Sequence, residues 1–258
     1  MHHLNFFLVS LFLICSPLAH AADDSGAGSQ SVRVGLVLNS GIPWLHVERG
    51  QEREGVGVSF GYGLYTEFRI TDHVSLSTGL TQSNYTAGVK YEDDVYFSYQ
   101  AIEQGEEQAP DTSLLISRSY LFNTIELPLL LKLKIAKVGY FTYFCELGFV
   151  GNVIYKSQTK KNQISVDGVN SDLSGSLDRI DANDVTNWFR GAVSVSAGFE
   201  WNFVGRTSLL VKANVADGLT NILKDDAADE TDLTYLSGSV VKQKGTLNYF
   251  GLSVGLLF

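Results

Sequence analysis

The stretch from Phe189 to Phe203 reads FRGAVSVSAGFEWNF and alternates between two kinds of side chain. Successive side chains of a β-strand point to opposite faces of the sheet, so the odd and even positions form two separate faces. The odd face carries mainly Phe, Val, Ala and Trp, whereas the even face carries Arg190, Glu200 and two serines. This alternation predicts a strand with one face suited to lipid and the other suited to a tight polar interior.

The same pattern recurs in eight segments and predicts an all-β fold. In the last segment, Tyr249–Phe258, every second residue from Phe250 onward is a large apolar one. Several segments exceed the usual strand of about 5 to 6 residues, as a tilted strand that crosses a membrane must. The other six predicted strands are Ser31–Asn39, Val56–Ile70, Val74–Tyr91, Arg118–Ile135, Tyr140–Tyr155 and Thr207–Ala216.

The connections between these segments alternate between short and long. The short ones are Thr71–His73, Ala136–Gly139 and Gly205–Arg206, and the long polar ones are Gly41–Gly55, Glu92–Ser117, Gln158–Asn187 and Leu223–Gln243. Outer-membrane barrels have short periplasmic turns and longer external loops. The sequence therefore predicts a single eight-stranded antiparallel up-and-down transmembrane β-barrel with four long external loops and both termini in the periplasm.

The spacing of aromatic residues favours membrane insertion over a soluble, lipocalin-like barrel. Phe189 precedes Trp201 by 12 residues, and Tyr143 precedes Tyr155 by the same number. At about 3.3 Å per residue and a tilt near 40°, this spacing rises roughly 30 Å, close to the ~25 Å apolar band between two aromatic girdles. A soluble barrel would reverse the faces and point its apolar residues inward.

The N-terminal residues resemble an export signal rather than part of the barrel. Residues 1–21 contain no Asp, Glu, Lys or Arg, include the apolar run Phe6–Cys15 and end in Ala19-His20-Ala21. This is typical of a signal peptide cleaved after Ala21, and the run is shorter than the ~20 residues of a spanning helix. We expect residues 22–30 to form a short flexible segment and residues 31–258 to form the barrel domain.

Composition excludes several classes of site. The formal net charge is −9, Cys145 is the only cysteine after the predicted signal peptide, and His46 and His73 are the only histidines there. The acidic balance disfavours nucleic acid as a partner. One cysteine cannot form a disulfide framework or a CxxC pair, and two histidines cannot form a histidine cluster. We therefore predict no cofactor and no metal site, and we expect Cys145 to be an apolar filler on the lipid face.

Charged residues within the predicted strands fall opposite the lipid face. An Arg or Lys on the lipid face near the midplane would cost about 2 to 4 kcal/mol. Because an eight-stranded barrel is just wide enough inside for side chains, we expect an ion-pair and hydrogen-bond core. A charged lumen for ion passage is the alternative, but wide aqueous channels have about 16 strands or more. The ten residues are Arg33, Glu67, Arg69, Glu126, Lys132, Lys134, Glu146, Arg190, Glu200 and Lys212.

Two histidines raise the question of catalysis. His73-Val74-Ser75 has the H-x-S spacing of some outer-membrane lipid A deacylases, in which an imidazole activates a serine hydroxyl. We place these residues in a periplasmic turn, away from the outer leaflet, with nothing nearby to complete a triad. His46, beside Trp44 in the first predicted loop, resembles the surface histidine of a barrel palmitoyltransferase, but it has no identifiable Asp-Ser companion. We therefore predict no catalytic residue.

Two of the predicted external loops are strongly acidic. Acidic side chains in these positions could bind Ca²⁺, bridge to lipopolysaccharide through divalent ions or dock a basic protein partner. No EF-hand spacing is present, so a solvated charged surface is the simplest interpretation. The residues are Glu92, Asp93, Asp94, Glu103, Glu106, Glu107 and Asp111 in one loop and the run Asp225–Asp232 in the other.

Two motifs carry a family resemblance. Tyr120–Lys132 reads YLFNTIELPLLLK, and Gly218–Ile222 reads GLTNI at the end of the predicted seventh strand. Both resemble the PorT-like outer-membrane β-barrel family, and the terminal Phe258 fits the residue that the barrel-assembly machinery reads. The resemblance implies an eight-stranded outer-membrane barrel; the namesake is associated with protein secretion across the outer membrane and with surface maturation of proteases. Pro128 lacks a ladder donor, so we expect a β-bulge there.

The leading functional hypothesis is a non-enzymatic outer-membrane protein with a structural or interaction role, accessory to protein secretion or surface attachment. Its expected partners are outer-membrane lipid and lipopolysaccharide, the barrel-assembly machinery through Phe258, and a protein bound by the acidic external loops. A small outer-membrane transporter or lipid-binding barrel is the alternative, followed by a lipid A-modifying enzyme.

Overall fold

The computed structural model describes residues 31–47, 51–99, 102–103, 106–107, 111–166, 169–172, 181–204, 207–224, 233–235 and 244–258. The predicted signal peptide, the segment 22–30, the turn Gly205–Arg206 and the acidic run Asp225–Asp232 lie outside these ranges. Within the ranges described, no helix is long and apolar enough to cross a membrane. The part of the chain from Arg33 to Phe258 forms one compact unit.

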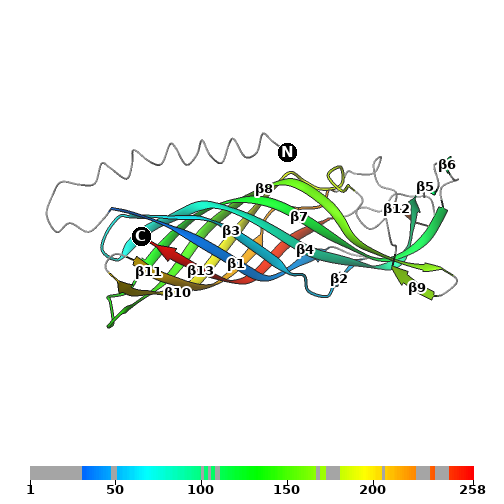
Figure 1. Cartoon of the computed structure of the whole chain (residues 1–258). Helices are drawn as coiled ribbons and strands as arrows, with labels where there is room; N and C mark the ends of the chain where they lie inside the picture. Colours follow the sequence, from blue (N-terminus) through cyan, green and yellow to red (C-terminus); the bar gives the residue numbers. More distant parts are fainter. Residues whose placement is uncertain are drawn as a thin grey trace. The chain divides into compact units, whose positions relative to one another are not determined.

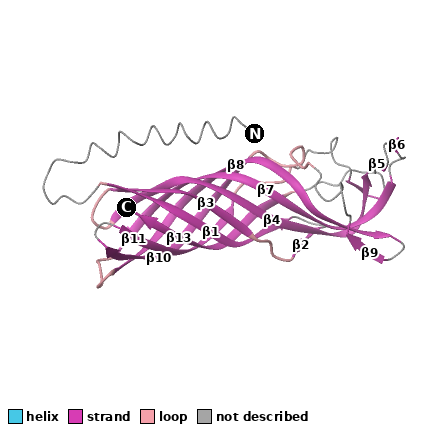
Figure 2. Cartoon of the chain, in the orientation of Figure 1, coloured by secondary structure: helices cyan, strands magenta, loops and turns pink. Residues whose placement is uncertain are grey.

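Eight long strands close into a ring, which confirms the predicted fold (Figures 1 and 2). Around the ring, each strand lies beside the next in chain order, and β13 returns to pair with β1, with Gly35 opposite Leu257. The pairing of β8 with β10, with Val153 opposite Phe189, closes the wall on the other side. The ring strands are β1 Val32–Val47, β3 Ser59–Arg69, β4 Val74–Tyr99, β7 Asp111–Lys134, β8 Phe141–Val166, β10 Phe189–Val204, β11 Thr207–Gly218 and β13 Gly245–Leu257.

Tight connections gather at one end of the barrel, which we call the turn end. Between β3 and β4, the backbone N–H groups of Ile70 and Thr71 both donate to the Val74 carbonyl at 2.9 Å. Between β7 and β8, Gly139 has φ +62°, a left-handed conformation that glycine adopts without steric cost. Since Gly35 pairs with Leu257, β1 begins and β13 ends at this same end. We call the opposite end the loop end.

Short strands extend the wall at the loop end (Figure 1). β2 and β12 pair with β4 and β9 pairs with β8, whereas β5 and β6 pair with each other in a separate two-stranded sheet. Their bounds are β2 Gln51–Glu54, β5 Ile102–Glu103, β6 Glu106–Glu107, β9 Val169–Asp172 and β12 Leu233–Tyr235.

The predicted boundaries of the long loops were wrong. β1 continues eight residues past the predicted end at Asn39, and β4, β7 and β8 run well into the segments assigned to loops. The predicted strands ended where the long polar segments begin. The ladders do not end there, because direct pairings continue as far as Tyr99 with Asp111.

The outer surface near the turn end carries an apolar band. Leu36, Leu129, Phe149 and Leu252 are each more than half exposed there. At the turn-end edge of this band, the rings of Phe141 and Trp201 stack 6.3 Å apart, and at its other edge Trp188 and Phe189 lie 5.7 Å apart. Phe189 and Trp201 thus occupy opposite edges of the band, as the aromatic spacing predicted.

The polarity of the two faces inverts along β4. Near the turn end its inward residues are small and polar, such as Ser75 and Ser77, and its outward residues include Leu76 and Leu80. From Tyr85 onward the inward residues become apolar, while the outward ones become polar. Inward in this second part lie Tyr85, Ala87, Val89 and Tyr91, and outward lie Thr86 and Lys90.

The β-bulge expected at Pro128 is absent, so that prediction was wrong. β7 keeps one register with β4 on both sides of this residue, with Thr78 opposite Leu129 and Thr81 opposite Glu126. The missing N–H of Pro128 interrupts the ladder without inserting a residue. Bulges do occur on β8, opposite the β7 steps Asn123/Thr124 and Ser119/Tyr120.

Candidate functional site

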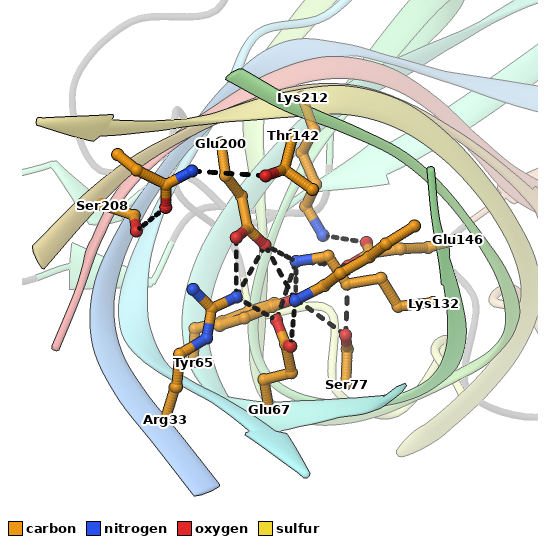
Figure 3. A network of polar contacts seen from close by, with 12 residues as sticks. Arg33, Tyr65, Glu67, Ser77, Lys132, Thr142, Glu146, Glu200, Ser208 and Lys212 are labelled. Atoms are coloured by element: carbon orange, nitrogen blue, oxygen red, sulfur yellow. Dashed lines mark hydrogen bonds and ion pairs between the residues drawn. The ribbon is translucent and has the colours of Figure 1, made fainter. Parts of the chain in front are cut away.

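Most of the inward charges meet near the turn end in one network, which we call the ion layer (Figure 3). Six ring strands contribute to it: β1, β3, β7, β8, β10 and β11. Each side chain points inward because it occupies the polar parity of its strand. The members are Arg33, Glu67, Lys132, Lys134, Glu146, Glu200 and Lys212.

Lys132 lies at the centre of the ion layer and is fully buried. Its Nζ lies 2.9 Å from a Glu67 oxygen, forms an ion pair with Glu200 and lies 4.0 Å from Glu146. The same ammonium lies over the Phe144 ring at 4.0 Å from the centroid. One cation therefore links the carboxylates of three different strands.

The remaining cations complete two halves of the layer. Arg33 bridges Glu67 and Glu200 at 2.8 and 2.7 Å, and Lys134 also forms an ion pair with Glu67. In the other half, Lys212 lies 2.6 Å from Glu146. Glu146 also accepts hydrogen bonds from Tyr65, Ser77 and Ser196, at 2.8, 3.1 and 2.9 Å.

A second group, the middle layer, lies between the ion layer and the loop end. Buried Glu126 accepts a short hydrogen bond from Tyr85. The guanidinium of Arg190, only 1% exposed, donates to the Leu247 carbonyl at 3.2 and 2.7 Å. When the Asn152 amide is oriented with its oxygen toward Arg190, it accepts from that guanidinium at 2.6 Å.

A cavity of about 80 Å³ lies between the ion and middle layers. Tyr65 and Lys212 line it on one side, and Glu126, Arg190 and Tyr249 line it on the other. Because a water needs roughly 10 to 15 Å³ of such space, the cavity has room for a few waters.

The loop-end half of the interior is mainly apolar, and we call its apolar residues the apolar layer. Buried Arg118 also lies in this half and donates to Asn162 Oδ1 at 2.8 Å. The predicted interior was polar, so this layer corrects that prediction. Its signal was present at residues 85–91, where Tyr85, Ala87, Val89 and Tyr91 alternate with Thr86, Gly88 and Lys90. Its largest fully buried members are Leu45, Leu115, Tyr120, Phe122, Ile222, Leu223 and Leu247.

The GLTNI motif covers part of the apolar layer. It begins at the end of β11, as predicted. It is hydrogen-bonded to β10, where the Gly191 N–H donates to Thr220 Oγ1 at 2.9 Å. The Asn187 N–H donates to the Ile222 carbonyl, and the Ile222 N–H donates to the Gly245 carbonyl, both at 2.8 Å. The motif thus buries Ile222 and Leu223 completely.

Arg69 is the predicted inward charge that joins neither polar layer. It lies at the rim of the turn end with its side chain 34% exposed, and it forms an ion pair with Asp72 at 3.2 Å. The other nine predicted charges lie in the ion or middle layer, so the expected ion-pair core is observed.

The histidines lie apart from any shared site. His73 is exposed in the turn, whereas Ser75 is 1% exposed on the inward face of β4. His46 is part of β1, opposite Thr246, rather than part of a loop as predicted. Cys145 is exposed on the outer face of β8, where the sequence placed it.

The acidic segments are described only in part. Glu92–Asp94 belong to β4, but the positions of their side chains lie outside the description, as does the whole run Asp225–Asp232. Among the side chains that the structure does place, no group of three or more His, Cys, Asp or Glu could hold a metal ion. Divalent-cation binding by these segments stays a prediction.

A model of a known protein family matches most of the chain. The family model described as "Outer membrane protein beta-barrel domain" matches residues 28–224, which include seven of the eight ring strands. No curated protein sequence matches the chain significantly.

Solved outer-membrane proteins are similar at low identity. Neisserial surface protein A is 10% identical with a TM-score of 0.44, covering 89% of this chain and 97% of its own. OprG from Pseudomonas aeruginosa is 10% identical with a TM-score of 0.44, covering 88% and 95%. The outer membrane protease OmpT from Escherichia coli is 8% identical with a TM-score of 0.36, covering 92% and 99%.

Proposed function

Because this chain belongs to the outer membrane protein β-barrel domain family, we propose that it is a non-enzymatic barrel of the bacterial outer membrane that holds an external β-platform for a protein partner. We define the platform as the loop-end parts of β4, β7 and β8 with β2, β9 and β12 paired to them. The observation that carries the proposal is the length of β4, which continues 17 residues beyond Gln82. At about 3.3 Å per residue and a tilt near 40°, this part rises roughly 40 Å above the apolar band.

The filled interior supports an interaction role over transport. The ion layer, with Lys132 fully buried, fills one half, and the apolar layer, with Tyr120 and Phe122 fully buried, fills the other. Solute passage would require both layers to open. A transporter or lipid-binding barrel remains the alternative function, and the cavity of about 80 Å³ offers it little room.

We place the turn end in the periplasm and the loop end outside the cell. Short turns lie on the periplasmic side in barrels of this kind. Phe258 lies on the seam between β13 and β1, where its N–H donates to the Val34 carbonyl at 2.8 Å and its side chain is 55% exposed. In this proposal it is the residue that the barrel-assembly machinery reads, after export through the signal peptide.

The PorT-like motifs support a shared barrel type rather than a shared partner. Glu126 and Lys132 of the first motif lie in the middle and ion layers, and Ile222 of the second lies in the apolar layer. We propose that the platform supplies the individual role, as an accessory of protein secretion or of surface attachment. Its acidic segments would then bind a basic protein surface.

The test shortens the platform without opening the barrel. Val95 and Leu115 pair directly, so residues 96–114 can be replaced by a tight Asn-Gly turn at that point. We expect the variant to keep the heat-dependent shift in electrophoretic mobility that folded barrels show. We also expect it to lose the cross-linked protein species that a photo-reactive residue at position 90 captures in native cells. Unchanged cross-links would contradict the proposal.

A further inference from the structure

Two β-bulges give the outer face of β8 an unusual set of side chains. The β7 neighbours Asn123 and Thr124 pair with Lys156 and Ile154, which leaves Tyr155 as an extra residue. In the same way, the β7 neighbours Ser119 and Tyr120 pair with Lys161 and Thr159, which leaves Lys160 as an extra residue. A bulge redirects side chains locally. As a result, Lys156, Lys160 and Lys161 are all exposed, while Ile154, Ser157, Thr159 and Asn162 are buried.

These three lysines begin at the edge of the apolar band. The edge is marked by hydrogen bonds along the outer surface: Tyr62 donates to Gln82 Oε1 at 3.0 Å, and Gln82 donates to the Tyr155 hydroxyl at 2.9 Å. Lys156 follows Tyr155 directly. Lys160 and Lys161 lie roughly 10 to 15 Å farther from the band at about 3.3 Å per residue and a tilt near 40°. Membrane headgroups occupy this height.

The charge around the lysines is compatible with an anionic ligand. Within the part of the chain that the structure describes, Lys156 and Lys160 form no ion pair. The acidic neighbours that the structure places are Asp181, which bridges to Gln158, and Asp184 in the same segment. On the β7 side, Glu54 accepts hydrogen bonds from Ser117 and Ser119, at 2.7 and 3.0 Å. Asp181 accepts from the Asn183 N–H at 2.9 Å.

We propose that Lys156, Lys160 and Lys161 form a binding site for the phosphate groups of lipopolysaccharide in the outer leaflet. The same strand presents exposed Leu147, Phe149 and Val153 directly below the lysines. This arrangement fits an amphiphile whose phosphates adjoin its acyl chains, because ammonium groups meet the phosphates and the apolar band meets the chains. The assignment to the outer leaflet rests on the proposed orientation of the barrel, with the loop end outside the cell.

The test compares two variants with the same loss of charge. In K156Q/K160Q/K161Q, the site loses its three ammonium groups. In the control R53Q/K90Q/K137Q, three exposed cations are lost from β2, β4 and the turn between β7 and β8. Both proteins, folded in detergent micelles and checked by heat-dependent mobility, are titrated with diphosphoryl lipid A, with monophosphoryl lipid A and with inorganic phosphate. Native mass spectrometry measures the bound fraction.

We expect K156Q/K160Q/K161Q to weaken binding of diphosphoryl lipid A at least tenfold, and the control to change it less than twofold. Monophosphoryl lipid A should bind the unaltered protein more weakly than the diphosphoryl form. Equal losses in the two variants, or no loss in either, would overturn the site. Inorganic phosphate that competes with diphosphoryl lipid A at equal concentration would identify a site for free phosphate and would overturn the lipid assignment.

A second measurement tests the proposed orientation of the barrel independently of phosphate binding by the three lysines. In a K160C variant that also carries C145A, a membrane-impermeant maleimide should label position 160 in intact cells. Labelling only after the outer membrane is permeabilised would overturn the proposed orientation and the outer-leaflet assignment. The micelle titration would still decide whether the three lysines bind lipid phosphate, because it does not depend on orientation.

Discussion

The interior of this barrel is ionic in its turn-end half and mainly apolar in its loop-end half. Lys132 at the centre of one half and Phe122 in the other lie on the same strand, β7, and on the same inward face. The alternation has the same period in both halves, but its polarity is opposite. We attribute the difference to the surroundings of the wall. Where lipid covers the outside, charged residues turn inward and pair with one another; where water covers the outside, apolar residues turn inward as in a soluble protein.

Substitutions in the two halves should therefore destabilise the barrel for different reasons. In the ion layer, removing one partner leaves the others buried and uncompensated, which costs more than the pair itself contributes. In the apolar layer, removing a side chain loses its transfer free energy and leaves a cavity. Four substitutions, taken from the largest expected effect to the smallest, test this contrast.

The largest effect is expected for Lys132→Met. It leaves Glu67, Glu146 and Glu200 without their shared cation, so we expect the unfolding free energy in lipid vesicles to fall by about 3 to 5 kcal/mol. Urea titration followed by tryptophan fluorescence measures it. Lys137→Met, an exposed lysine in the turn between β7 and β8, is the control and should change it by less than ~0.5 kcal/mol. Equal effects for the two lysines would show that the ion layer is not a coupled network.

Ile222→Ala should destabilise the apolar layer by about 2 to 4 kcal/mol, because Ile222, the last residue of the GLTNI motif, is fully buried. The same urea titration applies. Leu219→Ala, three residues earlier and 59% exposed on the outer surface, is the matched control with a smaller loss. The reverse order would mean that the motif serves the lipid-facing surface rather than the interior.

Tyr85→Phe tests the middle layer, where the two halves meet. The substitution removes the hydroxyl that donates to Glu126 and leaves that buried carboxylate with one partner fewer. We expect a loss of about 1 to 3 kcal/mol in unfolding free energy. Tyr62→Phe removes an exposed hydroxyl of the same kind and should cost less. A negligible effect for Tyr85→Phe would indicate that Glu126 finds another donor in the cavity.

The smallest effect is expected for Gln82→Leu, at the boundary between the two halves on the outer surface. It removes the hydrogen bonds to Tyr62 and Tyr155 but extends the apolar band by one residue. We expect the lost hydrogen bonds and the extended apolar band to offset one another, so that the unfolding free energy changes by less than ~1 kcal/mol. Lys90→Leu, farther toward the loop end, places the same side chain in water and should promote aggregation in light scattering, which Gln82→Leu should not.

Much of the barrel could be predicted from the sequence because period-two alternation has a simple physical cause. The fold, the turn end and the inward direction of nine charges followed from it, since an Arg190 or Lys212 side chain on the lipid face would be costly. The grouping of these charges into two layers could not be predicted. It depends on the stagger of neighbouring strands, which sets Lys132 beside Glu146 and Glu126 beside Asn152.

The loop-end half was harder to predict, because apolar residues were expected on the outer face and polar residues on the inner face along every strand. The predicted strand ended at Tyr91, where the acidic polar segment begins, whereas β4 continues to Tyr99. The prediction of a β-bulge at Pro128 was wrong for another reason. A residue without an N–H can stay in register and leave the ladder unpaired at that point, without an inserted residue. The bulges at Tyr155 and Lys160 leave no mark in composition, because each depends on the pairing with β7.

The most direct test of this account locates the lipid boundary on the outer face of β4. Single cysteines at positions 80, 82, 86 and 90, in a C145A background, carry spin labels in lipid vesicles. Their accessibility to oxygen and to a water-soluble nickel chelate is measured by electron paramagnetic resonance. We predict lipid exposure at position 80, water exposure at positions 86 and 90, and a crossover near 82. Lipid exposure at position 90, or water exposure at position 80, would contradict the claim that the inversion of polarity marks the membrane edge.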